Sequence, residues 1–255
     1  MTPAGGDILL CTNDDGVHSP GLKTLTEAAT AHGEVCVVAP DRQQSASSHA
    51  LTLHRPLRLT RLDDGRHTVD GTPTDCVLLA IREVLKESRP RFVLSGINHG
   101  PNMGEDVLYS GTVAAAMEAT ILGVPAAAFS YAGHQAEHLD SYGPLVGELV
   151  GSFLSRPDFP EETFLNVNLP DRPASGIEGV RVTSLGRRVY HDSLTKSVDP
   201  RGNEYVWIGG GRSDWRGRED SDFRAVRAGY VSVTPLHLDL TSFRLLEEVR
   251  SWSLG

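Results

Sequence analysis

The chain has 255 residues, of which 39% are hydrophobic and 22% charged, which is typical of a soluble globular protein with one sizeable domain. Its net charge of −9 argues against a surface for a nucleic acid polymer, although a metal ion or a helix N-terminus can still attract a small anion. No apolar run approaches the ~20 residues of a membrane span and MTPAGGD does not resemble a signal peptide, so we expect a cytoplasmic protein that makes no membrane contact.

Short apolar runs alternate with segments of helical spacing in the first half of the chain. Strands are predicted at 7–12, 34–40, 91–96 and 124–130, helices at 21–33, 72–86 and 112–123, and a β-hairpin around a DDG turn within 51–71. This alternation predicts an α/β fold, in which a mostly parallel sheet carries helices on both faces. Cys11, Cys36 and Cys76 lie in apolar stretches, and we expect buried free thiols.

The second half is less regular. The pattern predicts a helix at 139–155, strands at 163–170, 179–186 and 229–241, and a last helix at 242–252. Residues 187–227 are polar and charged, which fits either a protruding hairpin or a mobile arm. We predict one domain over 1–255, with a core at about 7–184, an arm at about 185–228 and a C-terminal strand and helix at about 229–255.

Polar residues follow three predicted strands of the first half. Asp14 and Asp15 follow the first strand, Ser45 lies in the loop after the second, and Asn98 follows the third. Ligands of parallel sheets bind outside the carboxyl ends of the strands, so these loops should open on one edge. The acids of NDDG either make a turn or supply oxygen ligands for a hard divalent cation.

The serine-rich loop APDRQQSASSHALTL also has two interpretations. Ser45 is a neutral oxygen ligand for Mg²⁺ or Mn²⁺, or it belongs to an ordinary polar loop. His49 is a proton donor, a phosphate contact or a solvated loop histidine.

The segment from Ser95 to Ala119 holds a long glycine-rich loop before a helix. Ser110, Gly111 and Thr112 stand where that helix begins, where free backbone N–H groups favour an anion. Plain N-capping is the alternative, and the length of the loop speaks against it.

Other known sites are excluded by their missing patterns. The chain has no G-x-x-x-x-G-K-[ST] loop, no G-x-G-x-x-G after the first strand and no G-x-S-x-G elbow. A dinucleotide-binding oxidoreductase is therefore disfavoured. The candidate ligands are oxygens, which favours Mg²⁺, Mn²⁺ or Ca²⁺ over zinc.

Five segments together resemble the SurE family of stationary-phase survival proteins, which are metal-dependent 5'-nucleotidases. They are TNDDG, VVAPDRQQSASSHALTL, GTPTDC, SGINHGPNMGEDVLYSGTVAAAMEA and GVPAAAFS, in the order and spacing of that family over most of residues 7–130. LNVNLP and GYVSVTPL are similar to later family segments. The resemblance implies a Rossmann-like three-layer core and a C-terminal hairpin or arm used in oligomers, either homodimers or homotetramers.

The resemblance also implies the roles of the candidate residues. Asp14, Asp15, Ser45 and Asn98 are expected to ligate one divalent metal ion per subunit, with Mg²⁺ or Mn²⁺ favoured and Ca²⁺ as a further possibility. The phosphate would be bound by four residues, Asn102, Ser110, Gly111 and Thr112. Asp14 or Asp15 would also orient or deprotonate the attacking water, and the products would be a nucleoside and inorganic phosphate.

Two other functions stay open at this point. One is a broad phosphatase or exopolyphosphatase without nucleoside selectivity, and the other is a module that binds a nucleotide without turnover. Base preference is not readable, although the ring of Tyr109 either stacks on a base or packs within its loop.

Overall fold

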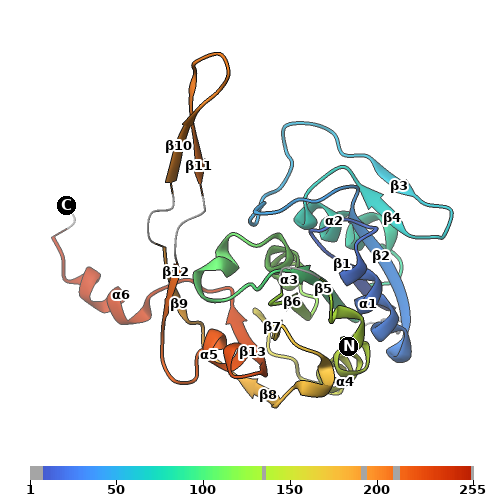
Figure 1. Cartoon of the computed structure of the whole chain (residues 1–255). Coiled ribbons are helices and arrows are strands. Elements are labelled where there is room, and N and C mark those ends of the chain that lie inside the picture. Colours follow the sequence, from blue (N-terminus) through green and yellow to red (C-terminus); the bar gives the residue numbers. More distant parts are fainter. Residues whose placement is uncertain (1–7, 134–135, 191–193, 209–212, 254–255) are drawn as a thin grey trace.

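The computed structural model describes residues 8–133, 136–190, 194–208 and 213–253. Within that part of the chain, nine strands form one sheet (Figure 1). They are β1 Ile8–Thr12, β2 Glu34–Pro40, β3 Leu59–Arg61, β4 His67–Val69, β5 Phe92–His99, β6 Ala126–Tyr131, β7 Thr163–Leu169, β8 Gly179–Val182 and β13 Tyr230–His237. Their order is β3-β4-β2-β1-β5-β6-β7-β13-β8, and the six strands from β4 to β7 in that order are parallel.

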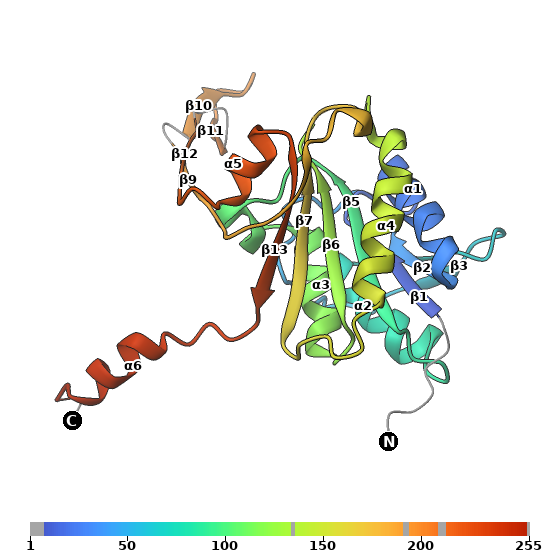
Figure 2. The same ribbon diagram turned by 90° about the horizontal axis from the view of Figure 1, so that it is seen from below.

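Helices cover both faces of this sheet, which confirms the predicted α/β fold (Figure 2). They are α1 Pro20–Ala29, α2 Pro73–Leu79, α3 Gly111–Ile121, α4 Gly143–Leu154, α5 Asp222–Arg227 and α6 Phe243–Arg250. Helices α1 and α4 pack into one core with strand residues such as Leu9 and Cys11. Helices α2 and α3 pack into the other core with Leu10, because alternate residues of a strand face opposite sides. No helix among the described residues is long and apolar enough to cross a membrane.

Capping residues mark the starts of α1 and α2. Ser19 caps α1 by accepting a hydrogen bond from the Leu22 N–H at 3.3 Å. Thr72 and Asp75 form a capping box at the start of α2, with Pro73 in its first turn. The predicted helix at 72–86 continues beyond α2 as a π-helical turn at Ala80–Val84.

Strand β5 is longer than predicted. We expected it to end at Gly96 with Asn98 in the following loop, but it runs on to His99. The register against β6 shifts between Ser95 and Asn98, and pairing then resumes at Asn98 with Ser130. Gly96 adopts a positive φ of 131°, so the glycine that suggested an end of the strand instead accommodates an irregularity within it.

The C-terminal region contains the protruding hairpin that was one of the two interpretations of its sequence (Figure 1). Strands β9 (Arg187–Tyr190) and β12 (Ser213–Arg216) form its base, and β10 (Leu194–Val198) pairs with β11 (Glu204–Ile208) further out. Helix α5 was not predicted, because we assigned its six residues to the polar arm. The buried carboxylate of Asp222 accepts hydrogen bonds from Gly104 N and Gly186 N, both at 2.8 Å, which join the base of the hairpin to the loop before α3.

The cysteines differ in one respect from the expectation. All three are free, and Cys11 and Cys76 are buried, but Cys36 is only partly buried. It stands near the start of β2, where the sheet is not fully covered.

Gly21 sets the closest approach between α1 and the sheet. A Cβ atom at this position would lie 1.9 Å from the carbonyl oxygen of Ile97. Gly147 in α4 offers a matched control, because its Cβ would meet only Ala28 O at an ordinary 3.6 Å.

We predict that Gly21→Ala destabilises the fold by about 3 kcal/mol, because the backbone of α1 or β5 has to move. Gly147→Ala should instead stabilise it by about 0.5–1 kcal/mol through helix propensity. Urea unfolding of both variants measures these changes, and equal stability of the two variants would contradict the close packing at Gly21.

Candidate metal and phosphate site

The NDDG segment forms a turn directly after β1, and its first and last residues build that turn. The side chain of Asn13 accepts from Gly16 N at 3.2 Å and donates to Gly16 O at 3.0 Å and to Ser19 Oγ at 2.6 Å. Gly16 has a φ of +98°, which glycine adopts without strain. Because Asn13 and Gly16 make the turn, the carboxylates of Asp14 and Asp15 are left for other contacts.

The Asp14 side chain is buried against the start of α3, where it is only 5% exposed. Its Oδ1 accepts a hydrogen bond from the Thr112 hydroxyl. A Cβ on Gly111 would lie 2.9 Å from Asp14 Cβ and 3.1 Å from Asp14 Oδ2, so only glycine leaves room for this carboxylate. The structure thus brings Asp14, Gly111 and Thr112 into one contact.

The pKa of Asp14 is raised to about 6: burial raises it most, the Thr112 hydrogen bond opposes the rise, and the neighbouring charge of Asp15 adds to it. Burial also raises the pKa of Asp15, against the hydrogen bond that its Oδ2 accepts from His99 N at 3.1 Å. His99 Nδ1 lies 4.0 Å from the same carboxylate oxygen. Both acids therefore occupy surroundings in which their negative charge is under-compensated.

The serine-rich loop lies against this pair. The Gln44 N–H donates to the backbone oxygen of Asp14 at 2.7 Å, which places Ser45 one residue from the contact. Ser45 is exposed, and its hydroxyl accepts from Gln43 Nε2 at 2.8 Å. Ala46 and Ser48 have positive φ values of 55° and 52°, which cost energy in residues other than glycine and are often found at functional sites.

Ser47 is a residue that the sequence analysis did not single out. Its Oγ is buried without a hydrogen-bond partner and lies 2.7 Å from where a Cβ on Gly111 would stand. Because this buried hydroxyl beside Asp14 has no partner in the protein, it can form a hydrogen bond with an oxygen atom of a bound ligand.

Asn98 and Asn102 lie differently with respect to this edge. Asn98 is half-buried near the end of β5, and because its Nδ2 donates to Gly100 O at 2.8 Å, its amide oxygen remains for a ligand. Asn102 is buried, and its Nδ2 donates to Ser130 Oγ at 2.8 Å. Its side chain is therefore engaged inside the sheet. Asn166 and Asn168 also donate to the backbone carbonyl of Asn102, at 2.8 and 3.0 Å.

The start of α3 is capped as its sequence suggests. The Ser110 hydroxyl accepts from Val113 N at 3.1 Å. The N-capping interpretation of Ser110 is therefore realised, and the Thr112 hydroxyl is occupied by Asp14. What this helix start offers to an anion is its remaining backbone N–H groups.

The donor set of this edge fits a hard divalent cation. Among the described residues, no group of three or more His, Cys, Asp and Glu side chains is arranged to hold a metal. Two under-compensated carboxylates with a serine hydroxyl and an amide oxygen nearby are instead the ligand types of Mg²⁺, Mn²⁺ or Ca²⁺. A cation would remove the cost of burying the Asp14 charge beside Asp15.

A cavity of about 370 Å³ opens beside these residues. Asp15 and His99 line it, together with His18, Arg42 and Gln43. The cavity therefore offers polar side chains next to the less buried of the two acids.

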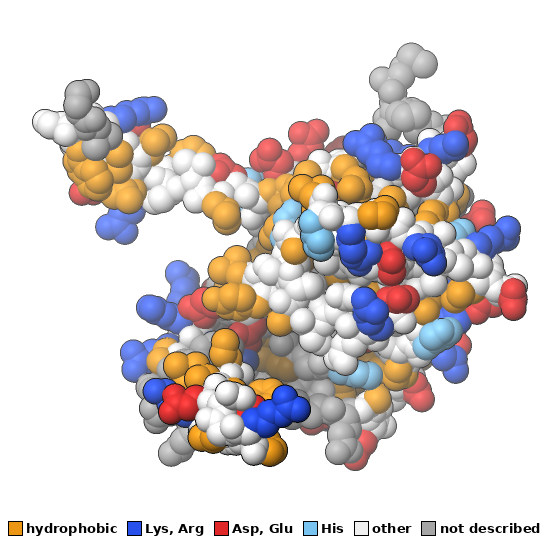
Figure 3. Space-filling view, turned by 90° about the horizontal axis from the view of Figure 1, so that it is seen from above, with side chains coloured by type: hydrophobic (Ala, Val, Ile, Leu, Met, Phe, Trp, Pro, Cys, Tyr) orange, Lys and Arg blue, Asp and Glu red, His pale blue; other side chains and the backbone are white. Residues whose placement is uncertain are grey.

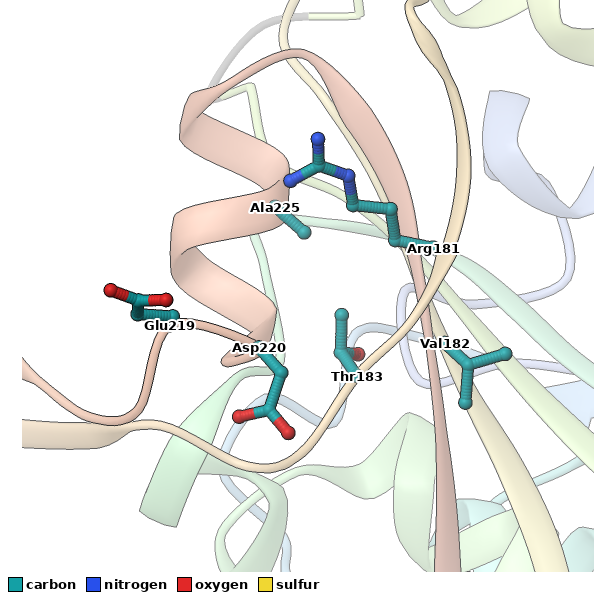
Figure 4. Close-up of a pocket in the computed structure, with 6 residues that line it drawn as sticks. All are labelled: Arg181, Val182, Thr183, Glu219, Asp220 and Ala225. Atoms are coloured by element: carbon teal, nitrogen blue, oxygen red, sulfur yellow. The ribbon is translucent and has the colours of Figure 1, made fainter.

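A second cavity of about 360 Å³ lies between β8 and α5, with Arg181 on one side and Asp220 on the other (Figure 4). The Arg181 guanidinium lies 3.5 Å from the centre of the Tyr230 ring, and the Thr183 hydroxyl bonds to Ser232 at 2.8 Å. Asp220 accepts from Ser184 at 3.1 Å. These groups already have partners, so the cavity offers no comparable chemistry.

The structure also pairs two residues beside the site. His49 Nε2 lies 2.8 Å from Glu118 Oε2. The sequence indicated His49 but not Glu118. The signal that could have indicated Glu118 is its place as a single charge in the apolar run TVAAAMEATI.

Tyr109 is 61% exposed, so the prediction that its ring packs within the loop is wrong.

Comparisons with known proteins agree on one family. The model of the family described as survival protein SurE matches residues 9–192. A protein of Gemmatimonas aurantiaca named 5'-nucleotidase SurE is 57% identical, covering 96% of this chain and 98% of its own length. A protein of the same name from Geobacter sulfurreducens is 50% identical, covering 97% and 94%. The crystal structure of the SurE protein from Aquifex aeolicus superposes with a TM-score of 0.85 at 44% identity, covering 95% of this chain and 98% of that one.

The raised pKa of Asp14 predicts a pH-dependent penalty in metal-free protein. The folded state keeps a proton on Asp14 up to about pH 6, whereas the unfolded chain loses it near 3.8, so the free energy of unfolding falls as pH rises between these values. Two pKa units correspond to about 3 kcal/mol. Asp14→Asn should therefore gain stability relative to wild type on going from pH 4 to pH 8.

Denaturant unfolding in the presence of a chelator measures this change. Asp63→Asn, which alters an exposed acid in the β3–β4 turn, serves as the control and should track wild type. A difference between Asp14→Asn and wild type that stays constant with pH would contradict the assignment.

Proposed function

The chain belongs to the SurE family, and we infer from this membership that it is a 5'-nucleotidase, a hydrolase that releases phosphate from nucleoside monophosphates. The observation in the structure that best supports this chemistry is the buried Asp14 carboxylate held beside Asp15 at the start of α3. Such an arrangement binds a cation next to a helix N-terminus, and the two together suit a phosphate monoester.

We propose that Asp14, Asp15, Ser45 and Asn98 hold one divalent metal ion, as the SurE family is metal-dependent. Oxygen ligands favour Mg²⁺ or Mn²⁺, with Ca²⁺ as an alternative. When bound, the ion supplies positive charge for a phosphate oxygen and lowers the pKa of water. The under-compensated charge of the two acids supports this assignment.

The phosphate would lie at the start of α3. The backbone N–H groups of Gly111 and Thr112 belong to the first turn of α3, whose N–H groups have no partner within the helix, and would stabilise the equatorial oxygens of the phosphate. The Thr112 N–H also bonds to the Asp14 carboxylate, so it would be shared between the two. Ser110 supports them indirectly, because its hydroxyl caps the helix at Val113 N. Asn102 would act through the position of its loop, since its side chain bonds to Ser130.

The two acids would divide the catalytic work. Asp14 is engaged by Thr112 and buried, so it serves best as a fixed ligand. Asp15 lines the cavity and would orient the attacking water and take its proton. The nucleoside would occupy that cavity, where Arg42 and Gln43 offer hydrogen bonds. The described lining includes no Phe, Tyr or Trp side chain, so we expect weak base selectivity.

An assay of phosphate release tests this function. Chelated protein is supplied with nucleoside 5'- and 3'-monophosphates, polyphosphate or p-nitrophenyl phosphate, and with Mg²⁺, Mn²⁺, Ca²⁺, Zn²⁺ or no metal. We expect metal-dependent release, fastest from 5'-monophosphates, and a loss of at least about a hundredfold in Asp14→Asn but not in Asp63→Asn. Equal rates on every ester would favour a broad phosphatase, and no release would favour a binding module.

We further propose that the C-terminal region assembles the protein into a homodimer or homotetramer. Figure 3 shows hydrophobic side chains gathered on α6, which stands away from the body. Phe243 is 67% exposed on α6 and Ile208 is 87% exposed on β11, and such surfaces usually mark an interface. Exchange of a terminal segment between copies is a low-cost route to a dimer.

Light scattering tests the assembly. Wild-type protein should have two or four times the mass of the chain, and Phe243→Asp combined with Leu246→Asp should reduce that mass. A wild-type monomer would overturn the proposal.

Two expectations from the sequence stay predictions. They are the division into a core, an arm and a C-terminal element, and the location in the cytoplasm.

A further inference from the structure

Helix α3 carries a single charged residue, Glu118, and that residue is buried. Glu118 is 5% exposed and is the only charged residue between Gly111 and Ile121. Burial of a lone carboxylate is costly, and even a paired one rarely stabilises a fold more than apolar side chains of similar size would. Core packing alone therefore does not explain Glu118.

Its partner comes from the serine-rich loop. His49 Nε2 and Glu118 Oε2 are 2.8 Å apart, with the histidine side chain 30% exposed and the glutamate side chain 7% exposed. A carboxylate accepts, so the imidazole donates. The pair thus ties a loop without regular structure to a buried point on a rigid helix.

Helix α3 connects the His49–Glu118 pair to the candidate metal site. Glu118 follows Gly111 by seven residues, so the two lie on the same helix face about 10 Å apart. Ser47 lies against Gly111 at one end of that face, and His49 lies against Glu118 at the other. The loop therefore runs along α3 away from Asp14.

The same stretch carries local strain and two further contacts. Ala46 and Ser48 hold positive φ values on either side of Ser47. Ser48 donates through its N–H to Tyr109 O at 3.1 Å and through its hydroxyl to Leu108 O at 2.7 Å. Such a conformation persists only when surrounding contacts determine it. Of the hydrogen bonds described above for Ser48 and His49, the one between His49 and Glu118 reaches the buried side of α3.

We propose that Glu118 and His49 are positioning residues that hold the serine-rich loop closed on the Asp14 edge and so set the affinity for the divalent metal. This inference rests on the proposed function for the identity of the ligand. It assigns to the pair no contact with substrate.

Direct binding of Mn²⁺, measured by calorimetry, tests the proposal in His49→Ala, Glu118→Gln and the double variant. Each single change should weaken Mn²⁺ binding about tenfold, and the double variant should be no weaker than the worse single one, because both remove one contact. His49→Gln keeps an amide donor for Glu118 and should recover most of the affinity. His54→Ala, an exposed histidine of the same segment, should bind as wild type does.

Hydrogen exchange gives a readout that does not depend on metal. The Gln44 and Ser48 amides, which bond to Asp14 O and Tyr109 O, should exchange about tenfold faster in His49→Ala, with β1 unchanged. His49 lies on the surface loop, so this variant should fold even if Glu118→Gln does not.

Unchanged Mn²⁺ affinity together with unchanged exchange in His49→Ala would overturn the proposal. Additive losses in the double variant would also overturn it, because they mean that the two residues act separately. If wild-type protein binds no Mn²⁺, the proposed metal site fails, and the exchange of the two amides alone decides whether the pair holds the loop.

Discussion

Burial of the Asp14 carboxylate at the carboxyl edge of the sheet is the constraint on which the site depends. Strand β1 delivers this acid to the start of α3, where Thr112 hydrogen-bonds it and Gly111 leaves room for it. The turn itself is made by Asn13 and Gly16, which leaves the carboxylates of both acids available for contacts outside the turn. A second acid beside a buried one adds repulsion, and a divalent cation is the simplest group that relieves both costs.

The sequence predicted the parts of this arrangement that parallel topology dictates. Apolar runs separated by helical segments imply that Asp14, the loop of Ser45 and Asn98 meet at one edge, and the order β2-β1-β5 places them on neighbouring strands. Periodicity did not predict how these residues contact one another. Gly96 suggested the end of a strand that in fact continues to Asn98 and His99, because an irregular register absorbs the glycine. Glu118 was missed because its meaning depends on His49, 69 residues earlier in the chain.

The less regular half of the chain was the hardest to predict, and it is also tied to the site. Helix α5 is short and highly charged, so its sequence resembles a loop. Its first residue, Asp222, nevertheless binds Gly104 N and Gly186 N, and a second contact links Arg188 N to Glu105 at 2.6 Å. The loop before α3 therefore stands on the base of the protruding hairpin. An interface formed by that hairpin would therefore contact the structure that supports the loop before α3, and this loop leads into residues 110–112 of the proposed phosphate site.

The central claim is that one divalent ion binds where β1, the serine-rich loop and β5 converge. Anomalous X-ray diffraction from a crystal soaked in Mn²⁺ tests it most directly. The account predicts one strong peak at about 2.1–2.5 Å from oxygens of Asp14, Asp15, Ser45 and Asn98. A peak that appears only at other residues, or no peak at this edge at a saturating Mn²⁺ concentration, would contradict it.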